Sequence, residues 1–226
     1  GLVVVDEQHR FGVRQRNLLL NKGLQPHLLT MTATPIPRTL ALSLHGDLDV
    51  SQIDELPPGR TPINTKLYSI HHMDKVYNLI RDELTKGQQA YVVLPLVDES
   101  EKLDLRSAIK VHEELSRDVF PEFSVGLLHG RMNGVDKQRV IEKFINKQFH
   151  ILVSTTVVEV GVDVPNATVM VVENADRFGL AQLHQLRGRV GRGPLQSHCI
   201  LLYESNNKVS KQRLEVLSRT NDGFEI

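Results

Sequence analysis

Short apolar runs alternate with longer amphipathic stretches along most of the chain. This alternation predicts an α/β fold, in which helices cover both faces of a parallel sheet. The first run, Leu2 to Val5, is continuous and rich in β-branched residues, as is typical of a strand buried on both faces. Later strands are predicted at Lys66 to Ile70, Ala90 to Leu94, Ser124 to Leu128, His150 to Ser154, Thr168 to Val172 and His198 to Tyr203.

The amphipathic stretches between these runs predict the helices. The clearest helix begins at Asp74, a suitable N-cap, and ends at Gly87. Another covers Asp136 to Asn146 and turns Phe144 inward. The charged segment Val97 to Arg106 is expected to form an exposed loop that leads into a helix.

A proline-rich segment separates two parts of the chain. Leu56 to Pro62 contains three prolines and one glycine in seven residues, a composition that suits an extended connector and opposes a helix or a central strand. We therefore expect one domain over residues 1–62 and another over residues 63–226. Because a natural chain rarely starts on a bare core strand, we also expect the sequence to be a piece of a longer protein.

Composition places the chain among globular proteins. Hydrophobic residues make up 40% of the sequence and charged residues 24%, which argues against a disordered or collagen-like chain. No apolar run approaches the roughly 20 residues that a membrane-spanning helix needs. The single cysteine, Cys199, cannot form a disulfide within the chain and is expected to be a buried strand residue. We therefore predict a reducing, cytoplasmic location.

The net charge is zero, with 27 basic and 27 acidic residues, so overall charge does not indicate a nucleic-acid partner. The distribution of charge is more informative. Between Arg177 and His198 the sequence has four arginines, two histidines and no carboxylate. A solvated basic face is the simplest interpretation of this segment before the spacing of its residues is considered.

Two adjacent carboxylates, Asp6 and Glu7, follow the first predicted strand. They stand at its carboxyl end, where open α/β sheets bind their ligands. One carboxylate of such a pair can hold Mg²⁺, and the other can orient and deprotonate an attacking water in phosphate hydrolysis. An ordinary polar strand end is the alternative. The segment Thr32, Ala33 and Thr34 ends another apolar run and could connect a nucleotide site to a moving neighbour.

The most specific pattern is the octapeptide from Gln185 to Arg192, QLRGRVGR. Arginines three residues apart in this octapeptide are expected on one face of a helical turn. The glycines at 188 and 191 would keep the surface low, so that another chain segment can approach. Planar guanidinium groups match phosphate oxygens and neutralise charge that develops in a transition state. A contact with a nucleic-acid backbone is the alternative for Arg187.

Two further segments have the composition of a nucleic-acid backbone contact. The hydroxyls of Ser154 to Thr156 end a predicted strand and could hold a phosphodiester without reading bases, and Asp163 could accept a ribose hydroxyl. The segment His129 to Arg131 follows another strand and could make a similar contact. Ordinary turn residues and a structural histidine are the alternatives.

Four segments, taken in chain order, resemble motifs II, III, V and VI of superfamily 2 helicases: Asp6 to His9, Thr32 to Thr34, Ser154 to Asp163 and Gln185 to Arg192. Longer stretches resemble the RecG family, bacterial ATP-dependent DNA helicases that remodel stalled forks and Holliday junctions. The transcription-repair coupling factor has a similar motor, but its motif II resembles Asp-Glu-Glu-Gln, whereas Gln8 and His9 stand here. The stretches that carry the resemblance are Asp6 to Arg16 (DEQHRFGVRQR), Met31 to Leu42 (MTATPIPRTLAL), Gly46 to Thr65 and Glu159 to Gly193.

The resemblance implies RecA-like lobes: a second lobe over residues 63–226, preceded by the last strands of a first lobe over residues 1–62. It also implies ATP, Mg²⁺ and branched or double-stranded DNA as ligands. Asp6 would bind Mg²⁺, Glu7 would act as general base, and Gln185, Arg189 and Arg192 would complete the ATP site. The other implied roles are nucleotide binding or coupling by Gln8, His9, Gly161, Asp163, Thr32, Ala33 and Thr34, and DNA contact by Arg131, Thr155, Thr156 and Arg187.

Two parts of a complete motor of this family are missing from the sequence. None of the 15 glycines is followed by lysine, so the chain has no phosphate-binding loop of the GxxxxGK[ST] type. The wedge domain that precedes the motor in this family is also missing. We therefore expect an enzyme fragment that does not hydrolyse ATP by itself. A non-catalytic module that docks DNA or a partner is the alternative from another class.

Overall fold

The computed structural model describes residues 1–6, 26–31, 49, 51, 53, 60–96, 101–155, 164–204 and 208–221. The chain divides into two units, Gly1–Ile53 and Asp54–Ile226. The division falls just before the proline-rich segment Leu56 to Pro62, at whose end the sequence predicts a domain boundary.

The first unit contains a parallel pair of strands, β1 (Leu2–Val5) and β2 (His27–Thr30). Val5 is 2% exposed, but Leu2 and Val4 are 65% and 51% exposed. They lie on the same face as Leu29, which is also exposed, because Val4 pairs with Leu29 in the register. The prediction that this strand is buried on both faces is therefore wrong in the described structure, where one face of the pair is open.

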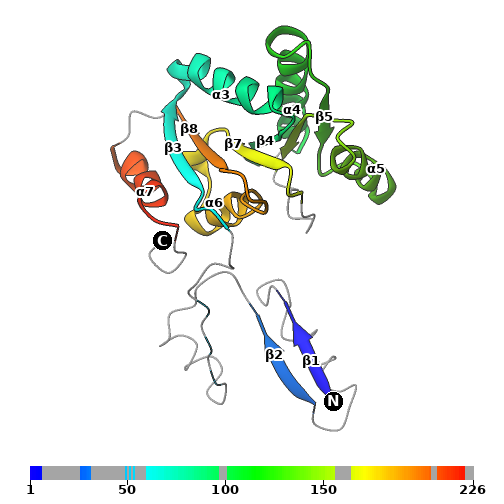
Figure 1. Ribbon diagram of the computed structural model, residues 1–226, viewed down its shortest axis with the longest axis vertical. Helices are drawn as coiled ribbons and strands as arrows, with labels where there is room; N and C mark the ends of the chain where they lie inside the picture. Colours follow the sequence, from blue (N-terminus) through cyan, green and yellow to red (C-terminus); the bar gives the residue numbers. More distant parts are fainter. Residues whose placement is uncertain are drawn as a thin grey trace. The chain divides into compact units, whose positions relative to one another are not determined.

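The second unit contains a six-stranded parallel sheet with the order β3-β8-β7-β4-β6-β5 (Figure 1). Every strand predicted for this part of the sequence is confirmed, and its ends lie within two residues of the expected ends. The parallel α/β fold class is therefore also confirmed. The strands are β3 (Asn64–Ser69), β4 (Gln89–Leu94), β5 (Val125–Leu128), β6 (Ile151–Thr155), β7 (Ala167–Val172) and β8 (His198–Tyr203).

Helices pack on both faces of this sheet, and each face has its own hydrophobic core. Successive residues of a strand enter opposite cores, so Tyr91 and Val93 of β4 pack on one face and Val92 on the other. Helices α5 (Gly134–Ile145), α6 (Leu180–Arg187) and α7 (Lys208–Arg219) contribute to the first core. Helix α3 (Met73–Thr85) and the end of α4 (Glu101–Glu114) contribute to the second core. The remaining described elements are three short helical turns: η2 (Ile70–His72), the π-helical turn η3 (Leu115–Val119) and η5 (Ala175–Arg177).

The start of α3 differs from the prediction. The N-cap is His72 rather than Asp74, which lies in the first helical turn. The reason is the preceding turn η2, in which the Ser69 side chain accepts a hydrogen bond from the His71 backbone amide. The predicted end is confirmed, because Gly87 has a φ of +81° and its amide bonds to the Leu84 carbonyl.

Helix α4 starts earlier than the sequence suggests. It begins at Glu101, so residues 101–106 are helical rather than the exposed loop expected over Val97 to Arg106. Residues 97–100 lie outside the described part of the chain. The prediction for α5 is closer, because the helix begins at Gly134, two residues before Asp136, and Phe144 is 1% exposed.

Cys199 lies in β8 and is 1% exposed, which confirms the expected buried strand residue. Burial raises the pKa of its thiol to about 12. The protonated thiol therefore packs as a small apolar group. In the described ranges no helix has the length and apolar character that crossing a membrane requires.

We expect Phe144→Ala to destabilise the protein by about 3–5 kcal/mol, because it removes a buried ring and leaves a cavity. The centroids of the Phe144 and Tyr91 rings lie 4.9 Å apart, so the substitution also removes a ring contact from Tyr91 of β4. Val135→Ala on the same helix is the control, since Val135 is 68% exposed and its loss should change stability by no more than about 0.5 kcal/mol. Urea denaturation followed by circular dichroism measures both. Equal stability of the two variants would contradict this account of the core.

Candidate nucleotide and DNA site

The arginine-rich segment lies at the amino-terminal edge of the six-stranded sheet. Helix α6 follows β7 and precedes β8, and because these strands are parallel the intervening chain must return to the edge where β8 begins. The loop over residues 188–197, called the arginine loop below, is held there by hydrogen bonds to the segment that enters β3. The Asn64 amide donates to the Ser197 carbonyl at 2.9 Å, and the Gln196 side chain donates to the Pro62 carbonyl at 2.7 Å. The arginine loop is thus attached to the segment through which the chain enters β3.

Two glycines allow this loop to pack closely. Gly191 has a φ of +75°, and a Cβ at this position would lie 2.9 Å from Cγ1 of Ile63. At Gly193 a Cβ would lie 3.0 Å from the Pro165 carbonyl oxygen. The close approach expected at the glycines of the octapeptide therefore occurs at Gly191, but with Ile63. At Gly188 the nearest contact would be an ordinary 3.4 Å.

Arg189 and Arg192 do not share a helical face. Helix α6 ends at Arg187, so both arginines lie in the loop that follows it, and the expectation of a helical turn is wrong for this pair. Instead, Nε of Arg192 donates to the Gly188 carbonyl at 2.9 Å, which orients its guanidinium along the loop. Both arginines are partly exposed, as is Gln185 in the last turn of α6. These three side chains are the candidate phosphate-binding groups of this unit.

Arg187 is placed very differently from its neighbours. It is 2% exposed, and one of its terminal nitrogens donates to the carbonyl oxygens of Leu217 and Thr220, each at 2.7 Å. The other terminal nitrogen lies 3.0 Å from Nδ1 of His184. Burial lowers the pKa of Arg187, yet guanidinium groups stay charged in proteins. This side chain is used to hold the end of α7, so a DNA contact by Arg187 is not supported.

Two other predicted DNA contacts, Thr155 and Arg131, lie at the opposite, carboxyl-terminal edge of the sheet. Thr155 is the last residue of β6 and is 2% exposed. Its hydroxyl finds no hydrogen-bond partner among the described residues, and the Ser154 hydroxyl donates to its carbonyl at 2.6 Å. Thr156 lies outside the described part of the chain. Thr155 therefore marks the strand end but does not expose a hydroxyl in this arrangement.

Arg131 lies between β5 and α5, in a group of basic side chains. The pKa of His129 is lowered first by burial and then by the positive charges of Lys137 and Arg131. These charges are thus close enough to His129 to repel a proton. The amino end of α5 is capped by Asn133, whose side chain accepts from the Asp136 amide at 2.8 Å. An exposed arginine beside a positive helix terminus is a suitable contact for a phosphate.

In the first unit, the parallel register brings two predicted segments to one edge. Val5 pairs with Thr30, and the Met31 amide donates to the Val5 carbonyl at 2.8 Å. Asp6, which is exposed, therefore leaves the pair beside Met31. The remaining predicted residues lie outside the described part of the chain, and their roles stay predictions: Glu7, Gln8, His9, Thr32, Ala33, Thr34, Thr156, Gly161 and Asp163.

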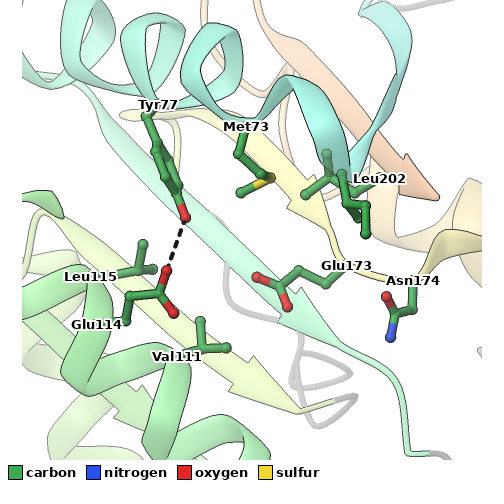
Figure 2. A pocket seen from close by; sticks show the side chains of 9 residues that line it. Met73, Tyr77, Val111, Glu114, Leu115, Glu173, Asn174 and Leu202 are labelled. Atoms are coloured by element: carbon green, nitrogen blue, oxygen red, sulfur yellow. Dashed lines mark hydrogen bonds between the residues drawn. The ribbon is translucent and has the colours of Figure 1, made fainter. Parts of the chain in front are cut away.

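A cavity of about 190 Å³, which the sequence did not predict, opens at the carboxyl ends of β7 and β8 between α3 and α4 (Figure 2). Glu173 follows β7 directly, Glu114 ends α4, and the Tyr77 hydroxyl donates to Glu114 at 3.5 Å. Burial, and then the charge of Glu114, raise the pKa of Glu173 to about 7. Burial and both carboxylates raise the pKa of Tyr77 to about 12. A glutamate directly after a buried strand was the signal available in the sequence.

The fold and the arginine loop define the class of protein: an α/β helicase lobe built on a parallel sheet. Residues 71–194 match the family described as the helicase conserved C-terminal domain, and the chain belongs to this family.

Relatives that carry the name ATP-dependent DNA helicase RecG match the whole chain. Those from Synechocystis and Thermotoga maritima are 59% and 52% identical over 226 residues, which span 27% and 29% of their lengths. A solved structure of RecG bound to a three-way DNA junction is 47% identical, with a TM-score of 0.80 over 100% of this chain and 29% of that one. The predicted similarity to RecG is therefore confirmed. The chain spans about three tenths of the length of these relatives.

A more distant similarity supports the fold alone. The helicase MrfA bound to DNA is 18% identical, with a TM-score of 0.67 that covers 100% of this chain and 32% of that protein. The parallel sheet and its helices are thus shared well beyond close relatives.

We expect Arg187→Met to lower the free energy of unfolding by at least about 1.5–3 kcal/mol, because the carbonyls of Leu217 and Thr220 lose charged donors. Arg177→Met, which removes an exposed arginine from the same segment, is the control and should be nearly neutral. Thermal denaturation and DNA-binding anisotropy are measured on both. A stable Arg187→Met variant with weakened DNA binding would restore the DNA contact predicted from the sequence.

The raised pKa of Glu173 predicts a loss of stability toward alkaline pH. In the folded protein the Glu173 carboxyl group keeps its proton up to about pH 7, whereas in the unfolded chain it loses the proton near its ordinary pKa of 4.5. The free energy of unfolding should therefore fall as pH rises from about 5 to 8. We expect Glu173→Gln to remove this loss, which is about 1–2 kcal/mol because water partly screens the carboxylate. Denaturation at pH 5 and 8 tests it, with the exposed Glu113→Gln as control. Parallel pH profiles of the wild type and Glu173→Gln would refute this prediction.

Proposed function

We propose that the chain is the second motor lobe, with the last strands of the first, of an ATP-dependent DNA helicase that remodels branched DNA. The observation that carries this proposal is the arginine loop. Its packing on Ile63 and its hydrogen bond to Pro62 connect Arg189 and Arg192 to the segment that leads into this lobe. A basic face with a purely structural role would not require two arginines on a loop whose conformation depends on glycine at position 191. The identity to RecG relatives over the whole chain supports the same activity.

ATP and Mg²⁺ are part of this proposal. Asp6 is an exposed carboxylate at the end of a parallel strand, and carboxylate oxygen is a ligand that Mg²⁺ prefers, so the residue fits the ion. No group of three or more His, Cys, Asp or Glu in the described residues could hold a metal alone. Asp6 would therefore share the ion with phosphate and water oxygens, and bound Mg²⁺ would neutralise phosphate charge. Glu7 would orient and deprotonate the attacking water.

Gln185, Arg189 and Arg192 would contact the phosphates of ATP. The two guanidinium groups suit charge that builds up on the transferred phosphoryl group, so they should act mainly on the transition state. Gln8, His9, Gly161 and Asp163 would contribute to nucleotide binding, and Thr32, Ala33 and Thr34 would couple it to motion. These roles follow from the resemblance of the motifs.

DNA would be held at the carboxyl edge of the sheet. The basic group around Arg131 suits phosphate oxygens, which carry no sequence information, so binding should be independent of sequence. Thr155 and Thr156 would contact the same backbone after a rearrangement that exposes the Thr155 hydroxyl. The RecG solved with a three-way DNA junction supports branched DNA as the partner. Within the parent protein, the other partners would be its wedge domain and the rest of its first lobe, and the location would be the cytoplasm.

Two other activities are possible for this fold. The translocating motor of a transcription-repair coupling factor would use the same arginine loop, so the test must include a branched substrate. A module that only docks DNA or a partner would not need Arg189 and Arg192 to act on ATP. Hydrolysis by arginine variants therefore separates the motor from the docking module.

In a full-length helicase that contains this sequence, Arg189→Ala or Arg192→Ala should lower DNA-stimulated kcat for ATP by roughly 10²-fold or more. Arg192→Lys should not restore it, because an ammonium group cannot reproduce a planar fork. DNA affinity without nucleotide should change little, and exposed Arg177→Ala is the matched control. Phosphate release and unwinding of a three-way junction are the measurements, with the 226-residue chain as the expected inactive reference. Intact hydrolysis with weakened DNA binding would contradict the proposal and favour a nucleic-acid face.

A further inference from the structure

The cavity between α3 and α4 lies apart from the arginine loop, because it opens at the opposite edge of the sheet. Figure 2 shows the carboxylates of Glu114 and Glu173 facing the same space, with the Tyr77 ring beside it. None of the nine residues that line this space is basic. The proposed nucleotide and DNA chemistry does not use any of them.

Apart from these groups and Asn174, the residues that line the cavity are apolar. Met73 comes from α3, Val111 and Leu115 come from α4 and the turn after it, and Leu202 comes from β8. At about 190 Å³ the cavity is smaller than the roughly 300–1,000 Å³ of typical small-molecule sites. Its size suits one side chain with an apolar stem and a charged end.

We propose that this cavity binds the guanidinium group of an arginine side chain carried by a polypeptide partner. The sign of the charge follows from the lining: two carboxylates and no basic side chain attract a cation and repel a phosphate, which excludes a nucleic acid as the occupant. Arginine is favoured over lysine for two reasons. Its planar fork can donate to two carboxylates at once, and it stacks on an aromatic ring such as that of Tyr77.

The electrostatics of the empty cavity support this occupant. Burial and the negative charge of Glu114 disfavour the ionised form of Glu173. A bound cation would remove this cost. Both carboxylates also raise the pKa of Tyr77, so all three groups act on the same volume. Because the cation binds the ionised form of Glu173, its affinity should increase between pH 6 and pH 8.

The position of the cavity gives the bound side chain a connection to the rest of the fold. Glu173 and Asn174 form the turn between β7 and η5, which leads into α6. Asn174 has a φ of +46°, a left-handed conformation that costs energy for a residue other than glycine. An arginine held by Glu173 would fix this turn from its solvent side. A partner could therefore dock on the lobe without covering the arginine loop.

The test is a titration of the 226-residue chain with N-acetyl-arginine amide, followed by the methyl NMR signal of Met73. We expect saturable shifts with a weak, millimolar affinity, since a single side chain makes the contact. The uncharged analogue N-acetyl-citrulline amide has nearly the same shape and should give no saturable shift. N-acetyl-lysine amide should bind more weakly than the arginine compound. Absence of saturation with arginine, or equal binding of citrulline, would overturn the proposal.

Variants locate the binding and exclude unfolding as a cause. Glu173→Gln should weaken arginine binding about tenfold at pH 8, which corresponds to one ionic contact of about 1.4 kcal/mol. It should also remove the increase between pH 6 and 8. Glu113→Gln, beside Glu114 in the sequence but outside the cavity lining, should bind like the wild type. Unchanged affinity of Glu173→Gln, with a native circular dichroism spectrum, would refute the site.

A free polyamine is the other source of the same charge. Spermidine, titrated under the same conditions, should bind more weakly than N-acetyl-arginine amide, because its ammonium groups cannot bridge two carboxylates in one plane. Tighter binding of spermidine that depends on Glu173 would overturn the assignment to a polypeptide side chain.

Discussion

Parallel strand pairing is the constraint on which the second unit depends. Every strand of its sheet runs in the same direction, so every connection must carry the chain from the carboxyl edge back to the amino edge. Residues that follow a strand and residues that precede the next one are therefore separated by the whole length of the sheet. This separation puts Arg131 and Thr155 at one edge and Arg189 and Arg192 at the other. Two chemically different surfaces thus arise from one rule of backbone pairing.

A pair of arginines connects helices α6 and α7 across this scaffold. Arg187, at the end of α6, donates to the Leu217 and Thr220 carbonyls at the end of α7. In the opposite direction, Arg213 of α7 donates to the carbonyls of Asp176 and Phe178, just ahead of α6. Because the acceptors are backbone atoms, these contacts fix the helices themselves. The arginine loop that continues from α6 therefore starts from a firmly held base.

Apart from β3, the strands of the sheet could be predicted because each contains a continuous apolar run with no competing helical period. The start of α3 could not, since the capping Ser69 belongs to a short turn whose sequence, Ile70 to His72, has no distinctive pattern. The burial of β1 was overestimated because an apolar run does not say whether both faces are covered.

Among the candidate site residues, motif spacing located the arginine loop but could not separate Arg187 from Arg189. The difference depends on where α6 ends and on carbonyls of a helix about thirty residues further along the chain. The acidic cavity was missed for the same physical reason. Tyr77, Glu114 and Glu173 come from three elements that only the folded sheet brings together.

The burial of Cys199 has a practical consequence for labelling this protein. The thiolate is the nucleophile that attacks thiol reagents, and a thiol with a pKa of about 12 at 1% exposure forms almost no thiolate near neutral pH. Since this is the single cysteine of the sequence, a new cysteine on an exposed position would react selectively with a maleimide dye. Fluorophores could then report on ligand binding without removing the native residue from the core.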